Sequence, residues 1–137
     1  MADSQVESEM KRRKKKPEAA FNNLYMGYRG GARQRAIGFE LTKEQFQDII
    51  GRRCTYCGRE PFQISWCRKG DGNGRFIKYM GIDREDPNRG YIQGNVVPCC
   101  VNCNYGKHDM SMREWSTYLD TLVQYRQSLN IADSNTQ

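Results

Sequence analysis

Apolar residues recur at helical spacing in the part of the chain that precedes the cysteines. The first group is Phe21, Leu24, Tyr25, Tyr28 and Ala32, and the second is Phe46, Ile49 and Ile50. Residues three or four positions apart share one face of a helix, so both groups predict helices with one buried face. Thr42 followed by Gln45 is a capping-box pattern that starts the second helix, and Gly51 is suited to end it. We therefore predict a helical lead-in over residues 18–53.

A similar pattern appears near the C-terminus. Ser111 and Glu114 form another capping-box pattern, next to apolar residues at Met112, Trp115 and Leu119. These apolar positions fall on one face of a helix. The pattern predicts a C-terminal helix over residues 111–129.

Between these helical parts lie two segments rich in β-branched and aromatic residues. They cover residues 76–83 and 91–97, and the turn sequence Asp86-Pro-Asn-Arg-Gly90 separates them. Two such segments joined by a turn predict a β-hairpin. The chain ends are polar: residues 1–17 include the basic run Lys11–Lys16 and are predicted to be a disordered basic arm, and residues 130–137 a disordered tail.

The composition indicates that this small fold needs a cross-link, either disulfides or a bound metal ion, in addition to its hydrophobic core. The chain has 137 residues, 37% of them hydrophobic, with 13 glycines and six cysteines, which suits one small, turn-rich domain. Residues 1–17 contain no apolar run typical of a signal peptide, and no segment approaches the length of a membrane span. We therefore expect an intracellular protein, in the cytoplasm or a host-cell cytoplasm, or in the nucleus if the basic arm is an import signal. Thiols stay reduced there, which favours metal binding over disulfides.

The cysteine spacing predicts a structural zinc site. Cys54 and Cys57 form one Cys-x-x-Cys unit, and Cys100 and Cys103 form another. Two such units supply the four thiolates that tetrahedral zinc prefers, and a site closed by four thiolates leaves no position open for catalysis. Cys99 is an alternative to Cys100, through a Cys-x-x-x-Cys spacing.

The charge points to a polyanionic partner. The net charge is +6, which favours nucleic acid, with DNA expected first and RNA as the alternative. No membrane partner is expected, and the oligomeric state is not predicted. The proposed phosphate contacts are Arg75, Lys78, Arg84, Arg89 and Lys107.

Several motifs together resemble the zinc-containing HNH endonucleases of phage type. They are Cys54-Thr-Tyr-Cys57, Gly81-Ile-Asp-Arg-Glu-Asp86, Asn95-Val-Val-Pro-Cys-Cys100 and Val-Asn-Cys103-Asn104. The resemblance implies an α+β fold, with a small zinc-stabilised ββα-metal core of the His-Me finger type over residues 54–110. The flanking N-terminal and C-terminal helices would surround this core.

The resemblance also implies a second metal site, which would be catalytic. Asp83 and Asn104 match the positions that hold a divalent cation, and oxygen ligands suit Mg²⁺ or Mn²⁺. Asn95 matches the central Asn that shapes the loop. Arg84 stands where the family has its general-base His, and Arg cannot act as a base because it stays protonated. His108, the single histidine, is a candidate for a displaced base or a phosphate contact, and a water activated by the cation alone is another alternative.

The implied function is a metal-dependent endonuclease or nickase that hydrolyses phosphodiester bonds in DNA. Two alternatives stay open. One is an inactive, zinc-stapled module that binds nucleic acid, and the other is a structural or assembly protein that reuses the fold.

Overall fold

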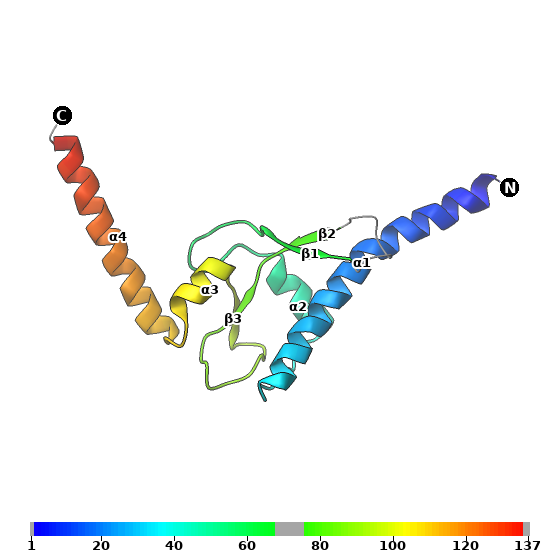
Figure 1. Ribbon diagram of the computed structural model, residues 1–137, viewed down its shortest axis with the longest axis horizontal. Coiled ribbons are helices and arrows are strands. Elements are labelled where there is room, and N and C mark those ends of the chain that lie inside the picture. The colour runs from blue at the N-terminus through cyan, green and yellow to red at the C-terminus, as the bar shows by residue number, and fades with distance from the viewer. Residues whose placement is uncertain (1, 68–75, 136–137) are drawn as a thin grey trace.

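The computed structural model describes residues 2–67 and 76–135 and contains two long helices around a small α+β body. The elements are α1 (Ala2–Gln34), α2 (Lys43–Ile50), β1 (Gln63–Trp66), β2 (Phe76–Tyr79), β3 (Ile82–Arg84), β4 (Val96–Pro98), α3 (Val101–Lys107) and α4 (Met112–Asn135). In Figure 1, α1 and α4 extend outward from the central body in different directions. Neither long helix carries an apolar stretch sufficient to cross a bilayer within the described residues.

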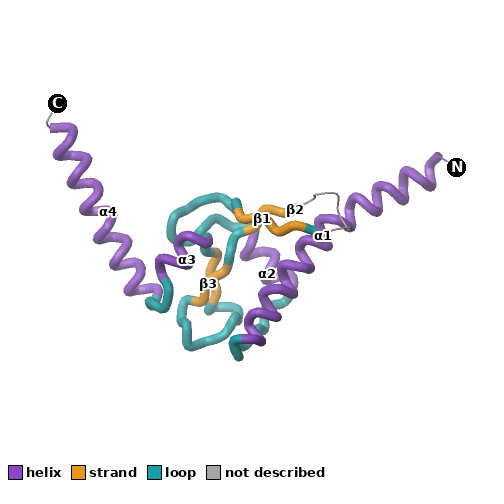
Figure 2. The backbone as a smooth tube through the Cα atoms, in the orientation of Figure 1, coloured by secondary structure: helices purple, strands orange, loops and turns teal. Residues whose placement is uncertain are grey.

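The strands form two separate antiparallel hairpins. β1 pairs with β2, from Gln63 opposite Tyr79 to Trp66 opposite Phe76. β3 pairs with β4, from Ile82 opposite Pro98 to Arg84 opposite Val96. Figure 2 shows the strands as short orange segments joined by long teal loops.

The predicted single strand over 76–83 is therefore divided, and its halves belong to different hairpins. The division falls at Met80 and Gly81, where the Met80 N–H donates to Ile50 O and the Gly81 carbonyl accepts from Cys99 N–H. A Cβ at Gly81 would lie 2.6 Å from Cys99 O, so a larger residue would block this crossing. The second predicted strand also begins later, at Val96, because Tyr91 forms an isolated bridge with Phe39 instead.

An aromatic core joins the lead-in helices to the hairpins. The Phe46 ring is fully buried, and its centroid lies 5.3 Å from the centroids of Tyr25 and Tyr28 of α1. The predicted start of α2 is confirmed, because Thr42 and Gln45 form both hydrogen bonds of a capping box, and Gly51 ends the helix. This core fixes α1 and α2 against the strand segments.

The structure differs from the predicted disordered ends. Helix α1 begins at Ala2, so residues 2–17 are helical, and α4 continues through residues 130–135. The Glu, Lys, Arg, Met and Ala residues in the first of these segments have high helix propensity. Extending a helix already fixed by packing needs no new nucleation, so both ends continue the helical path.

The contact between α3 and α4 predicts a specific stability effect at Gly106. A Cβ at this position would lie 2.7 Å from Cη2 of Trp115, which is buried at the start of α4. Gly106→Ala is expected to lower the free energy of unfolding by about 1–3 kcal/mol through overpacking. Thermal melting measures this change.

Gly27→Ala is the matched control for that measurement. Gly27 lies within α1, and a Cβ there would meet no atom within 4 Å. Because Ala favours a helix interior, this variant is expected to be more stable by about 0.5–1 kcal/mol. A Gly106→Ala protein that melts no lower than the parent would contradict the packing described for Trp115.

Candidate functional site

Four cysteine side chains converge where the start of α3 meets the turn after α2. The Sγ atoms of Cys54, Cys57, Cys100 and Cys103 all lie within 4.8 Å of one another. The Sγ atoms of Cys57 and Cys100 are 3.7 Å apart. A tetrahedral zinc with Zn–S bonds of about 2.3 Å places its sulfurs roughly 3.8 Å apart, so the spacing suits zinc.

Cys99 is not part of this cluster. Its buried Sγ donates to the carbonyl of Cys100, and burial raises the pKa of its thiol. Cys100 instead caps the N-terminus of α3, where its Sγ accepts from Cys103 N–H. The alternative in which Cys99 replaces Cys100 therefore does not fit the geometry.

Backbone groups favour the thiolate form of Cys54, the form that binds metal. Burial disfavours this thiolate, but N–H groups of Cys57, Cys100 and Tyr56 donate to it and lower its pKa to about 6. Burial and the neighbouring thiols raise the pKa of Cys103. One thiolate of the cluster is thus stabilised, while the other thiols lie too close together to ionise easily. A bound cation would neutralise the negative charge of the four sulfurs.

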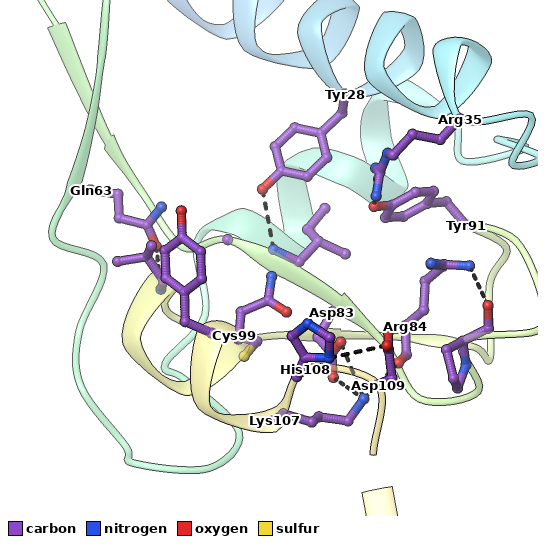
Figure 3. A pocket seen from close by; sticks show the side chains of 16 residues that line it. Tyr28, Arg35, Gln63, Asp83, Arg84, Tyr91, Cys99, Lys107, His108 and Asp109 are labelled. Carbon is purple, nitrogen blue, oxygen red and sulfur yellow. Dashed lines mark hydrogen bonds and ion pairs between the residues drawn. The ribbon is translucent and has the colours of Figure 1, made fainter. Parts of the chain in front are cut away.

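A polar pocket of about 420 Å³ lies beside the cysteine cluster, between the end of α1, β3 and α3. Its lining includes Asp83, Arg84, Asn104, Lys107 and His108, together with Tyr28 of α1 and Arg35 just after that helix. In Figure 3, Tyr28 and Arg35 lie on one side of the pocket, and Asp83, Arg84, Lys107 and His108 lie on the other. The structure thus brings the predicted Asp83, Arg84, Asn104 and His108 into one pocket.

Asp83 is the most strongly bound side chain in this pocket. Its Oδ2 lies 3.2 Å from Nζ of Lys107 and accepts from the hydroxyl of Tyr56 at 3.1 Å. The side chains of Lys107 and Asp83 are 1% and 8% exposed, so the ion pair is buried. Lys107 also donates to the carbonyl of Arg84. Lys107 is therefore a buried partner of Asp83 instead of the surface phosphate contact that was predicted.

Asn95 has the loop-shaping position predicted for it. Its side chain donates to the carbonyls of Asp86 and Gly90 and accepts from Asp86 N–H. The side chain is almost fully buried. These three hydrogen bonds tie Asn95 to the backbone of the loop between β3 and β4.

Arg84 is also fixed by this loop. Its Nη1 donates to the carbonyls of Pro87 and Arg89, and its guanidinium lies 5.5 Å from the Tyr91 ring centroid. The guanidinium carries a permanent positive charge at the pocket wall. Its position suits an anion and excludes a role as proton acceptor.

His108 lies outside the regular part of α3. The helix ends at Lys107, and His108 has a φ of 50°, so His108 does not continue the helical face that carries Asn104. Its Nδ1 lies 3.1 Å from Oδ2 of Asp109, and its side chain is 78% exposed. His108 is therefore a solvent-accessible group at the edge of the pocket.

The other predicted phosphate contacts lie outside the pocket lining. Lys78 is exposed on β2, Arg89 is exposed in the loop before β4, and Arg75 lies outside the described residues. The carbonyl of Arg89, and not its charge, contacts Arg84.

Three groups in or beside the pocket were not expected from the sequence. Tyr56 lies between the two cysteines of the first Cys-x-x-Cys unit. Its hydroxyl donates to Asp83, and burial together with the Asp83 charge raises the pKa of its phenol. Tyr28 accepts from Ile82 N–H, and burial raises its pKa as well. Arg35 donates to the Tyr91 hydroxyl. Tyr28 was predicted only as one apolar position on the buried face of the first helix.

Comparison with known proteins relates this geometry to a nuclease fold. No protein-family model matches the chain. It is 29% identical over 134 residues to uncharacterized protein R423 of Acanthamoeba polyphaga mimivirus, a match that covers 88% of this chain and 22% of that protein. The chain thus spans about a fifth of that relative's length. Among solved structures it is similar to the rare-cutting HNH restriction endonuclease PacI, with a TM-score of 0.54 and 20% identity over 80% of this chain and 81% of that chain.

The chain has the fold of an HNH endonuclease. The predicted α+β, HNH-like architecture is confirmed by this likeness and by the four-cysteine cluster. The likeness extends to the fold alone, so the roles assigned to Asp83, Asn95, Asn104 and His108 stay predictions. These roles are taken up below as chemistry that the pocket supports.

Proposed function

We propose that this protein is a metal-dependent endonuclease or nickase that hydrolyses phosphodiester bonds of DNA in the pocket between β3 and α3. The observation that carries this proposal is the convergence of Asp83, Arg84 and Asn104 on one polar pocket of an HNH-like fold. RNA is the alternative substrate, since a phosphodiester presents the same charge in both. Four thiols at zinc spacing suit a reducing compartment, so we expect an intracellular location.

Two different metal ions suit the two sites. The four-cysteine cluster would hold a structural Zn²⁺, because sulfur ligands at tetrahedral spacing fit that ion. The carboxylate of Asp83 and the amide oxygen of Asn104 would hold Mg²⁺ or Mn²⁺, which prefer oxygen ligands. When bound, this second cation supplies Lewis-acid stabilisation of charge on the scissile phosphate.

The side chains of the pocket contribute fixed positive charge and one proton acceptor. Arg35 and Arg84 are each held by hydrogen bonds to neighbouring groups, so their charges are preorganised for a phosphate. His108 is the proposed proton acceptor. A proton on Nδ1 directed at Asp109 leaves Nε2 free to accept a proton from the attacking water. Tyr28 and Tyr56 keep their protons, and Tyr56 donates its proton to Asp83 in a hydrogen bond.

A second function has one specific observation in its favour. Lys107 already supplies a positive charge to Asp83, at 3.2 Å, where a catalytic cation would bind. A pocket neutralised in this way suits a zinc-stapled module that binds nucleic acid without cutting it. The third alternative, a structural or assembly protein, has no comparable support.

Cleavage of supercoiled plasmid distinguishes these functions. The full chain is incubated with plasmid and Mg²⁺ or Mn²⁺, beside Asp83→Ala and His108→Ala variants whose folding is checked by circular dichroism. The parent is expected to convert plasmid to nicked or linear forms. Asp83→Ala is expected to lower the rate about 1,000-fold or more, and His108→Ala about 100-fold, as for loss of a general base.

Each outcome separates one assignment from another. Absence of cleavage with either metal, together with salt-dependent DNA binding, would favour the binding module. Cleavage that persists in folded Asp83→Ala would remove Asp83 from the site. Cleavage that persists in His108→Ala would remove His108 as the base and leave the metal assignment intact.

A further inference from the structure

The β1–β2 hairpin carries a pair of aromatic residues, Trp66 and Phe76, on the side that faces solvent. Trp66 and Phe76 lie opposite each other in the register, with ring centroids 5.1 Å apart, and are 55% and 45% exposed. Ile64 is exposed on the same face, opposite Lys78. The other face is the one directed at α1, where Ser65 Oγ donates to the carbonyl of Ala20.

This two-stranded hairpin carries apolar side chains on both faces, because Tyr79 on the other face packs against the core. Apolar side chains normally face the core, and exposed apolar surface of this kind marks an interaction site. A cross-strand Trp–Phe pair that stays in water buries less apolar surface than a pair covered by a partner. It therefore contributes less favourable free energy. The outer face of the hairpin therefore indicates a partner with flat, apolar surfaces.

Positive charges border the aromatic residues. Lys78 lies on the same face of β2 as Phe76, and the guanidinium of Arg59 lies 5.7 Å from the ring centroid of Phe62, which is exposed just before β1. A neutral apolar partner would leave both charges without a counterion. Unpaired bases of a nucleic acid strand fit better, because bases stack on aromatic rings while their phosphates pair with Lys and Arg.

The position of the hairpin relative to the pocket supports the same partner. Gln63 is the first residue of β1 and also lines the pocket. Trp66 is three residues further along the strand, which corresponds to about 10 Å at roughly 3.3 Å per residue. A nucleic acid strand bound at the pocket would therefore reach this surface within a few nucleotides.

We propose that the outer face of the β1–β2 hairpin stacks on unpaired bases of a DNA strand, within a few nucleotides of the pocket. The surface consists of Arg59, Phe62, Ile64, Trp66, Phe76 and Lys78. The inference rests on the proposed function for where the DNA strand lies relative to the pocket. Stacking itself requires no cleavage. Trp66 and Phe76 are the central contacts because they are the exposed ring pair.

The two tryptophans of the chain make the contact measurable. Trp66 is exposed, whereas Trp115 is 5% exposed at the start of α4. Titration of the full chain with a thymidine oligonucleotide, without added divalent cation, is expected to quench the Trp66 emission. Trp66→Phe is expected to abolish the quenching. Trp66→Ala and Phe76→Ala are each expected to weaken oligonucleotide binding about 5- to 100-fold, the range for loss of one stacked base.

Two controls test whether bases and this surface are responsible. An abasic strand of equal length keeps the phosphates, and is expected to bind more weakly without quenching. Tyr125→Ala removes an exposed aromatic ring from α4 and is expected to leave binding unchanged. Equal quenching by the abasic strand, or unchanged affinity in folded Trp66→Ala, would overturn the stacking surface.

Other occupants of the surface give different results. A blue shift of Trp66 emission with anionic phospholipid vesicles but not with oligonucleotide would assign the surface to a membrane. A parent dimer that Trp66→Ala converts to monomer, with no quenching by DNA, would assign it to a second copy. Both results would overturn stacking.

Quenching without plasmid cleavage would retain stacking and reject the nuclease, whereas cleavage with no quenching would reject stacking alone.

Discussion

Cys100→Ser is expected to abolish zinc binding and to unfold the region around β3, β4 and α3. Cys100 is fully buried, its Sγ lies 3.7 Å from that of Cys57, and it also caps α3. Structural zinc contributes about 10–16 kcal/mol of apparent binding free energy at pH 7, so loss of one ligand outweighs the stability of a small domain. Purified protein is expected to contain about one zinc per chain, and the variant close to none, by elemental analysis.

Cys99→Ser is the matched control for this result. Cys99 is the adjacent residue, is equally buried, and donates to a carbonyl that a serine hydroxyl can also reach. It is expected to keep the zinc content of the parent, with a smaller loss of thermal stability. Zinc content that falls in Cys99→Ser and persists in Cys100→Ser would show that the ligand assignment is wrong.

Lys107→Met is expected to change both stability and metal dependence. Its ammonium is buried against Asp83, so removal leaves an uncompensated carboxylate and lowers the free energy of unfolding by about 3–5 kcal/mol. The same removal takes away a positive charge that competes with a cation for Asp83. The Mg²⁺ concentration for half-maximal plasmid cleavage is therefore expected to fall about tenfold.

A double variant separates the two effects of Lys107. Asp83→Leu combined with Lys107→Met removes both charges, so it is expected to recover most of the stability lost in Lys107→Met while showing no cleavage. Lys43→Met, which removes an exposed lysine of α2, is the control and is expected to leave the Mg²⁺ dependence unchanged. An unchanged Mg²⁺ dependence in Lys107→Met would argue against Asp83 as the cation ligand.

Local features of the sequence were sufficient to predict several elements. The spacing of the two Cys-x-x-Cys units determined which thiols could share an ion, because a two-residue spacer lets both sulfurs of a unit face one point. The capping box at Thr42 and Gln45 determined where α2 begins, because both of its hydrogen bonds are formed within four residues. The likeness of residues 54–108 to HNH endonucleases gave the fold of the core.

The local sequence pattern could not determine which strands pair with one another. Residues 76–83 alternate in a way that suits one strand, but Gly81 passes so close to Cys99 that the chain changes from one hairpin to another. Strand β1 was not predicted, because its four residues carry their apolar side chains toward solvent. Register depends on contacts between distant segments, so it follows from tertiary packing.

The sequence by itself determined the four-cysteine cluster, the starts of α2 and α4, and the residue types of a candidate nuclease site. Only the tertiary structure decided what Asp83 contacts. It paired this carboxylate with Lys107, 24 positions along the chain, and with the hydroxyl of Tyr56, 27 positions earlier. Charge and hydrogen-bond partners at such separations depend on how the cysteine cluster joins the turn after α2 to α3. Whether Asp83 is open to a cation is therefore a property of the folded chain and not of any motif.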